Sequence, residues 1–286
     1  MRNFVFILIL SLWVFTGPAA QSSGSGVLGL DISDAFSQMD AALAENDMSP
    51  EDFYYMGRAV AANILTRYRL YTQKPAQTLY LNTICSAITV NSPQPNLYNG
   101  YHVMILDTPE LNAFATPGGH IFITRGMLEA ANSEDALAAV IAHEIAHIQL
   151  NHGATLIKEM KDIRDLSNVA DRAAAIATRE ASLNERTMLF DNSVREMVNT
   201  LIQNGYAREQ EFAADTYALR LLSLAGYVPS SLVDVLNSIQ KTGTSGGING
   251  THPSPAQRIT NVQRELPRYR TQDTRSFRAS RFTVTK

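Results

Sequence analysis

The sequence NSEDALAAVIAHEIAHIQ, from Asn132 to Gln149, decides how the rest of the chain can be arranged. Asn132 or Ser133 can cap the N-terminus of a helix, and the two acidic residues that follow suit its first turn. The remainder is apolar and rich in alanine, a composition that favours helix. We therefore predict a buried helix over Ala136 to Leu150, against which the other elements must pack.

This predicted helix carries three polar side chains in an apolar stretch, His143, Glu144 and His147. The spacing of four residues places both imidazoles on one face, one turn apart. Two neutral imidazoles so placed can bind one Zn²⁺ in a tetrahedral site, and Glu144 can take a proton from water beside the metal. The alternative is a pair of core histidines, but burying this triplet would be costly without a partner such as a metal.

A catalytic zinc site needs a third protein ligand and an open position. The best source is the helical pattern AREQEFAADTYALR, residues 207–220, in which Glu211 and Asp215 share a face. Glu211 could bind the metal, while Asp215 could accept the second N–H of a histidine ligand and fix its tautomer. Glu209 competes for the ligand role and ranks second, because its face differs from that of Asp215. A solvated carboxylate pair is the alternative interpretation.

A fourth candidate residue, His252, lies in the sequence THPSPAQRI after a glycine-rich stretch. Ser254, Pro255 and Gln257 fit the N-cap, N1 and N3 positions of a helix. His252 would then be held just outside a helix start. It could donate to a developing oxyanion, or occupy the open zinc position in a resting state. The alternative is an ordinary surface histidine.

Outside these segments, periodicity predicts an α+β fold that is predominantly helical, with a small β-sheet beside the metal-binding helix. The predicted N-terminal helices lie at residues 32–44, 50–71 and 79–90. The predicted strands lie at residues 101–107, 113–116 and 120–124, with a turn at Pro117-Gly118-Gly119. From Met127 onward the chain is mostly helical, with a glycine-rich break at residues 243–250. Between His147 and Glu211 we expect packing helices, with a lid beside the cleft as the alternative.

Composition excludes several classes of protein. The chain has 286 residues, of which 45% are hydrophobic and 18% charged, so it is neither disordered nor a polytopic membrane protein. Lys and Arg number 24 against 27 Asp and Glu, a net charge of −3 that offers no bulk field for nucleic acid. Cys85 is the only cysteine, so no internal disulfide can form.

The two ends of the chain have compositions of their own. Residues 1–20 combine Arg2, an apolar run and small residues in the order of a signal peptide, and residues 21–30 suggest a flexible linker. We therefore expect export to the periplasm, with an uncleaved, membrane-associated anchor as the alternative. Residues 267–286 form a basic tail, expected to be solvated or an edge strand. Contact with an anionic envelope surface is the alternative for that tail.

Four short motifs follow one another along the chain, LNAFATPGGHI (111–121), HEIAH (143–147), EFAAD (211–215) and THPSPAQRI (251–259). In this order they resemble the motifs of the M48 peptidases, a family of gluzincin zinc metalloproteases. The resemblance extends over about Tyr101 to Arg264. The chain lacks a second apolar run of about 20 residues and a period of about 34 residues, so it resembles a soluble envelope type without helical repeats.

The resemblance implies roles for the residues that match these motifs. His143, His147 and Glu211 would bind one zinc ion, and Glu144 would act as the general base. His252 would be catalytic as a transition-state donor, or would occlude the metal at rest.

The resemblance also implies residues around this centre. Asp215 would support a histidine ligand, and Arg258 would hold the shape of the site or contact the substrate. His152 falls five residues after His147, a spacing that leaves the ligand face of a helix, so a structural role is expected. Substrate would bind along a strand edge and its turn, at Asn112, Ala113, Phe114, Gly118 and Gly119.

The implied activity is that of a zinc-dependent endopeptidase, with a gluzincin-like metalloprotease domain over residues 31–266. Its substrates would be extended polypeptides, in particular misfolded or unassembled envelope proteins, and its partners could include outer-membrane or envelope assembly factors. The alternative is a non-catalytic, zinc-stabilised chaperone or scaffold. Glu144 argues against that alternative, because a purely structural zinc site does not need it.

Overall fold

The computed structural model describes residues 49–156, 194–195, 197–199, 201–202, 205–242, 253–269 and 271–285. The predicted signal peptide, linker and first helix lie outside these residues, as do His252 and most of the segment between His147 and Glu211. Within the described part, no helix combines the length and the apolar character that a membrane span requires.

The sheet has three strands, β1 (His102–Leu106), β2 (Ala113–Ala115) and β3 (His120–Thr124), arranged in the order β1-β3-β2. Strands β1 and β3 are parallel, whereas β2 runs antiparallel to β3 with Phe114 opposite Phe122. All three strands lie where the sequence predicted them. Because β3 is central, β2 forms one edge of the sheet.

The predicted turn between β2 and β3 is a 3₁₀ turn, η1, at Pro117–Gly119. Gly118 and Gly119 have φ angles of 77° and 111°, which favour glycine. A Cβ on Gly118 would lie 2.4 Å from Tyr54 Cα, and one on Gly119 would lie 2.2 Å from Gly100 O. Both glycines are therefore needed for the close packing of this turn.

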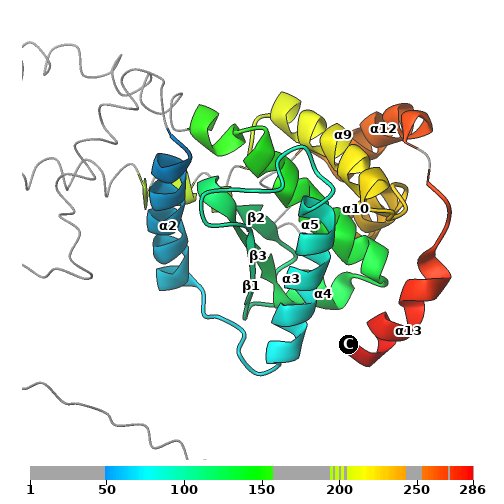
Figure 1. The fold of residues 1–286 in the computed structure, drawn as a ribbon, viewed down its shortest axis with the longest axis horizontal. Coiled ribbons are helices and arrows are strands. Elements are labelled where there is room, and N and C mark those ends of the chain that lie inside the picture. Colours follow the sequence, from blue (N-terminus) through cyan, green and yellow to red (C-terminus); the bar gives the residue numbers. More distant parts are fainter. Residues whose placement is uncertain are drawn as a thin grey trace, which may run out of the picture.

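Two helices cover opposite faces of the sheet (Figure 1). Helix α2 (Pro50–Arg67) packs Val60 and Ile64 against the face that carries Phe114 and Phe122. Helix α3 (Pro75–Thr89) packs on the other face, which carries the alternate strand residues Val103, Ile105, Ile121 and Ile123. The alternation expected of strands thus divides the apolar side chains between two core clusters.

Both helices differ from their predicted bounds for local reasons. Helix α2 ends at Arg67, not Tyr71, because the chain becomes extended and pairs with the end of β1. Tyr71 N donates to Ile105 O at 2.8 Å, and Asp107 N donates to Arg69 O at 2.8 Å. Helix α3 begins earlier than predicted, because Pro75 occupies its first turn.

Helix α5 (Glu134–Gln149) lies at the centre of the fold, and all of its residues are buried. As predicted, Ser133 caps it, with its Oγ accepting from Ala136 N at 3.1 Å. The short helix α4 (Arg125–Ala130) connects β3 to α5. The α+β, predominantly helical class with a small sheet beside this helix is confirmed.

Three further helices lie on the helical side of the molecule, α9 (Arg208–Leu224), α10 (Ser231–Thr242) and α12 (Pro255–Glu265). Helices α9 and α10 pack on α5, and α12 packs on both of them (Figure 1). The predicted cap of α12 is present, because Ser254 Oγ accepts from Gln257 N at 3.4 Å. A short 3₁₀ turn, η3, follows at Leu266–Arg268.

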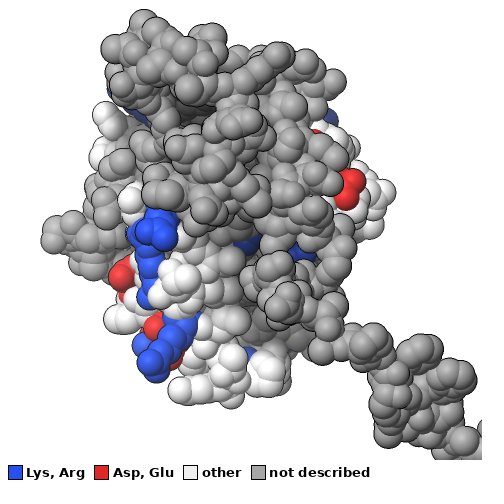
Figure 2. Space-filling view, turned by 90° about the vertical axis from the view of Figure 1, so that its left-hand side faces the viewer, with Lys and Arg blue, Asp and Glu red and all other residues white. Residues whose placement is uncertain are grey.

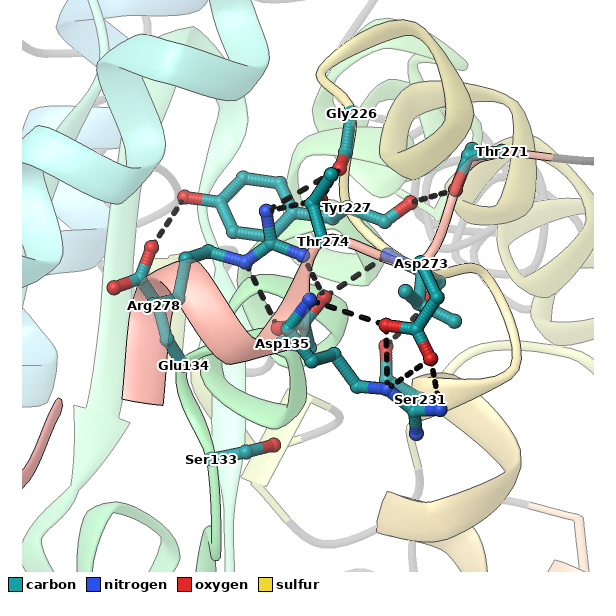
Figure 3. Close-up of polar contacts among 12 residues, drawn as sticks. Ser133, Glu134, Asp135, Gly226, Tyr227, Ser231, Thr271, Asp273, Thr274 and Arg278 are labelled. Carbon is teal, nitrogen blue, oxygen red and sulfur yellow. Dashed lines mark hydrogen bonds and ion pairs between the residues drawn. The ribbon is translucent and has the colours of Figure 1, made fainter. Parts of the chain in front are cut away.

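The C-terminal segment corrects a sequence prediction. Residues 275–285 were expected in a solvated tail or an edge strand, but they form a helix, α13 (Arg275–Thr285), that packs on the start of α5. Arg278 makes a bidentate contact with Asp135, at 2.9 and 2.7 Å (Figure 3). Arg281 pairs with Glu134. These two arginines therefore pair with two buried carboxylates. The sequence of the tail alone does not indicate this pairing, because both carboxylates lie in α5.

The surface charges in view are mixed. On the face shown in Figure 2, basic side chains lie next to acidic ones among uncharged residues. Among the described residues in view, the charges are therefore of both signs, in keeping with the near-neutral composition.

Candidate metal centre

Three side chains from two helices converge in the interior, His143 and His147 from α5 and Glu211 from α9. Their donor atoms all lie within 4.8 Å of one another. The two Nε2 atoms are 3.1 Å apart. Glu211 Oε2 is 3.4 Å from His143 Nε2, and its Oε1 is 3.5 Å from His147 Nε2.

Small residues allow α5 and α9 to approach each other so closely. Ala142 and Ala146 on α5 and Ala214 and Ala218 on α9 are completely buried. The helix period places Glu211 one turn before Asp215, so both carboxylates face α5. Glu211 is itself fully buried, whereas its competitor Glu209 is exposed. Of the two candidates for the third ligand, the structure thus places Glu211 beside the two histidines and leaves Glu209 at the surface.

A charged pair supports the first imidazole. Asp215 Oδ1 lies 3.2 Å from His143 Nδ1, on the opposite side of the ring from Glu211. Arg258 of α12 donates to Asp215 through Nε at 2.9 Å and Nη2 at 2.6 Å. Burial alone would lower the pKa of His143, as would nearby Arg258, but the bonds to Asp215 and Glu211 raise it to about 9.

The second imidazole has different supports. His147 Nδ1 lies 2.9 Å from His152 Nδ1. The ring of Tyr206 stacks on His147, with centroids 4.1 Å apart and planes at 16°. Tyr206 is not among the predicted site residues, and no motif marks it. His152, for which a structural role was expected, is not among the three clustered ligands and lies against the back of His147.

Glu144 lies beside the cluster and is 3% exposed. Burial, with a contribution from the charge of Glu211, raises the pKa of Glu144 to about 7. A carboxylate with such a pKa can take up and release a proton near neutral pH, as a general base requires.

The cluster fits a divalent cation. Two ligands about 2.0–2.1 Å from a tetrahedral zinc ion lie about 3.3–3.4 Å apart, close to the three distances between the donor atoms. When both imidazoles are neutral, as metal binding requires, the three buried carboxylates of Glu144, Glu211 and Asp215 outnumber the one guanidinium of Arg258, with which they interact. Imidazole and carboxylate ligands, together with this charge, suit Zn²⁺.

The outer edge of β2 lies close to α5. Thr116 N donates to His120 O at 2.8 Å, and Thr124 N donates to Asn112 O at 3.0 Å. The alternation of an antiparallel ladder then turns the backbone of Ala113 and Ala115 to the outer edge. Phe114, by contrast, packs its side chain into the core.

Two cavities lie along this edge. One of about 250 Å³ is lined by His147, Tyr206, Ala115 and Gly118, and extends to Leu97. The other, of about 30 Å³, is lined by Ala113, His143 and Glu144, with apolar side chains of α10. Both cavities therefore combine the edge of β2 with residues of the HEIAH motif. Gly119, also predicted to contact substrate, has the packing role described above.

Comparison with known proteins places the chain among peptidases. The sequence model for peptidase family M48 matches residues 75–266. The mitochondrial metalloendopeptidase OMA1 of Schizosaccharomyces pombe is 28% identical over 228 residues, 78% of this chain and 63% of that protein. The beta-barrel assembly-enhancing protease of Yersinia pestis is 23% identical over 263 residues, 89% of this chain and 52% of that protein.

A third relative has the same name as the second. The beta-barrel assembly-enhancing protease of Escherichia coli K12 is 25% identical over 196 residues, which are 66% of this chain and 39% of that protein. The chain thus spans between 39% and 63% of the length of these three relatives.

Proposed function

The chain belongs to peptidase family M48, whose model matches more than half of its residues, and on that premise we propose that it is a zinc-dependent endopeptidase. The observation that carries this proposal is the convergence of His143, His147 and Glu211 around one point, with Glu144 beside them. Its substrates are polypeptides in an extended conformation.

In this proposal each polar residue of the centre has one task. His143, His147 and Glu211 hold the zinc ion, which supplies Lewis-acid chemistry towards water and the peptide carbonyl. Glu144 takes the proton of the attacking water and delivers it to the leaving amine nitrogen. Its raised pKa, about 7, suits both transfers.

The surrounding residues orient this machinery. Asp215 holds the tautomer of His143 that keeps the proton on Nδ1 and the lone pair of Nε2 towards the metal, and Arg258 fixes Asp215. His252 remains the proposed donor to the oxyanion or the occluding ligand. This role rests on its place before the cap of α12, since His252 itself lies outside the described residues.

The substrate is proposed to lie between the edge of β2 and α5. An added strand would use the outward backbone of Ala113 and Ala115, and its side chains would enter the two cavities. Backbone pairing makes few demands on side chains, so it suits unfolded chains. We infer misfolded or unassembled envelope proteins as substrates, supported by the pattern of residues 1–20 and by the name of two relatives.

The alternative of a non-catalytic, zinc-stabilised chaperone or scaffold is less well supported. The described residues bring together three ligands in one cluster, which is the number of protein ligands in a catalytic zinc site. Glu144 is buried beside it, where burial disfavours its charged form. Such a group is expected in a hydrolase and has no purpose in a zinc-stabilised scaffold.

The test is the substitution Glu144→Gln in the full chain. We expect stoichiometric zinc in the purified variant, but cleavage of unfolded casein slower by about 10²–10⁴-fold, because the general base is gone. Glu209→Gln is the matched control, since Glu209 is exposed on the same helix as Glu211. A chelator should abolish wild-type cleavage. Zinc-loaded Glu144→Gln that cleaves casein at the wild-type rate would refute the proposal, and suppression of aggregation without cleavage would favour the chaperone.

A further inference from the structure

The two histidines of the cluster differ in what lies behind them. Nδ1 of His143 contacts the carboxylate of Asp215, which forms an ion pair with Arg258. His147 is backed at Nδ1 by another imidazole, that of His152, at 2.9 Å. His147 and His152 are both buried, at 2% and 7% exposure.

We propose that His152 is the positioning residue of His147, accepting a hydrogen bond from its Nδ1–H and so directing its Nε2 at the metal. The proposal rests on the proposed function, because it takes His147 to be a zinc ligand. It assigns His152 a part in metal binding without making it a ligand.

The positions of the protons on the rings of His147 and His152 support this assignment. His147 Nε2 faces His143 Nε2 and Glu211, so it must offer a lone pair to the metal, and the proton of His147 must be on Nδ1. Two nitrogens 2.9 Å apart share one proton, so His152 Nδ1 is the acceptor. His152 is therefore neutral, with its own proton on Nε2.

The backbone explains why His152 can reach this position. Helix α5 ends at Gln149, and Asn151 has a φ of 54°, in the left-handed region where asparagine is favoured. The chain therefore leaves the path of α5 and turns back before His152. Helical spacing does not apply to this residue, so the interval of five, from which a structural role was expected, could not reveal the contact with His147.

The other face of His147 is fixed as well. Tyr206 stacks on the His147 ring, and its own ring lies 5.8 Å from that of His152. Tyr206 limits tilting of the imidazole, whereas the bond to His152 Nδ1 selects which nitrogen carries the proton. Loss of that bond should therefore weaken metal binding even in a correctly folded protein.

The test measures zinc affinity by competition with a chromophoric chelator, in the full chain carrying Glu144→Gln to prevent self-cleavage. Substituting His152→Phe keeps a ring but removes the acceptor, and should weaken zinc binding by about 10- to 100-fold. His152→Asn places an amide oxygen near the position of Nδ1, and should bind zinc within a few-fold of the parent. His152→Gln carries its oxygen one bond further out and should resemble His152→Phe.

Two controls separate the possible causes. His120→Phe removes a ring whose Nδ1 is buried without a hydrogen-bond partner in the described structure, away from the cluster, and should leave zinc affinity unchanged. Thermal unfolding of the metal-free variants checks that each is folded. If His152→Phe does not fold, the His152→Asn and His152→Gln pair still decides.

The outcomes also separate this inference from the proposed function. If the parent binds no zinc, the proposed function fails first. If the parent binds zinc and all His152 variants bind it equally well, the positioning role is wrong while the proposed function stands. With Co²⁺ in place of zinc, the absorption bands should shift in His152→Phe and return in His152→Asn, which a purely structural role would not produce.

Discussion

At the residue scale, the centre depends on how buried charges are balanced. Arg258 is 4% exposed and makes its strongest contacts with Asp215. One of its Nη atoms also lies 3.5 Å from Glu211. Of the two roles that the resemblance implied for Arg258, holding the shape of the site is the one that these contacts support. A charge so enclosed is costly to remove, because its partners remain buried without compensation.

We therefore expect Arg258→Met to destabilise the metal-free protein by about 3–5 kcal/mol. Chemical denaturation followed by circular dichroism measures the change. Arg264→Met is the matched control on the same helix, where Arg264 has a 71% exposed side chain and its partner Glu265 keeps a second contact from Arg268. The control should cost less than about 1 kcal/mol. An equal loss of unfolding free energy in the two variants would show that the buried ion pair of Arg258 does not stabilise the protein.

Single residues also show how far the sequence could predict this centre. The spacing of His143 and His147 is fixed by the helix period, so their common face could be predicted. The pairing of Glu211 with them depends on how α9 packs on α5, and it was suggested by the face that Glu211 shares with Asp215 and by the resemblance of EFAAD to a family motif. Tyr206 and the contact of His152 depend on the path of the chain after α5, which no local pattern encodes.

At the scale of elements, α5 is held at both ends by polar contacts. At its C-terminus, the Gln149 side chain contacts Ser92, Tyr101 and Tyr217. At its N-terminus, Asp135 accepts from Val228 N at 2.9 Å and from Arg278 of α13. The helix that carries the HEIAH motif is thereby fixed to elements before and after it in the chain, and Figure 3 shows the contact between Asp135 and Arg278 at its N-terminus.

We expect Arg278→Met to destabilise the protein by about 1–3 kcal/mol, because Asp135 is 1% exposed and would lose its cation. Thermal unfolding gives the measurement. Arg275→Met is the control from the first turn of the same helix, where Arg275 pairs with the exposed Asp273 and little change is expected. Should Arg278→Met melt at the wild-type temperature, α13 would not hold α5 in solution.

The elements were predictable to different degrees for a physical reason. Strands β1 to β3 and the cap of α5 are encoded by neighbouring residues, through alternation and through Ser133. The end of α2 depends on pairing with β1, and the docking of α13 depends on two carboxylates more than 140 positions earlier in the chain. Interactions over such separations are not visible in a local pattern.

At the scale of the whole molecule, the sheet and the helical layer meet along the edge of β2 (Figure 1). The metal centre lies between a larger cavity beside Ala115 and a smaller one beside Ala113. A peptide lying along the two cavities would pass Glu144 while its backbone pairs with the edge of β2. In an added strand, only every second residue forms backbone hydrogen bonds with one neighbouring strand. The contribution of substrate residues to binding along β2 should therefore alternate from one residue to the next.

Single N-methylation of a cleavable peptide tests this recognition without altering the protein. On one side of the scissile bond, methylation should lower kcat/KM by about 2- to 10-fold at positions that donate to β2, since a net hydrogen bond contributes about 0.5–1.5 kcal/mol. The positions between them should tolerate the methyl group and serve as the control within the same series. A uniform loss at every position, or none at all, would mean that the edge of β2 does not bind substrate as an added strand. An alternating profile would instead identify Ala113 and Ala115 as the residues that align the peptide with Glu144.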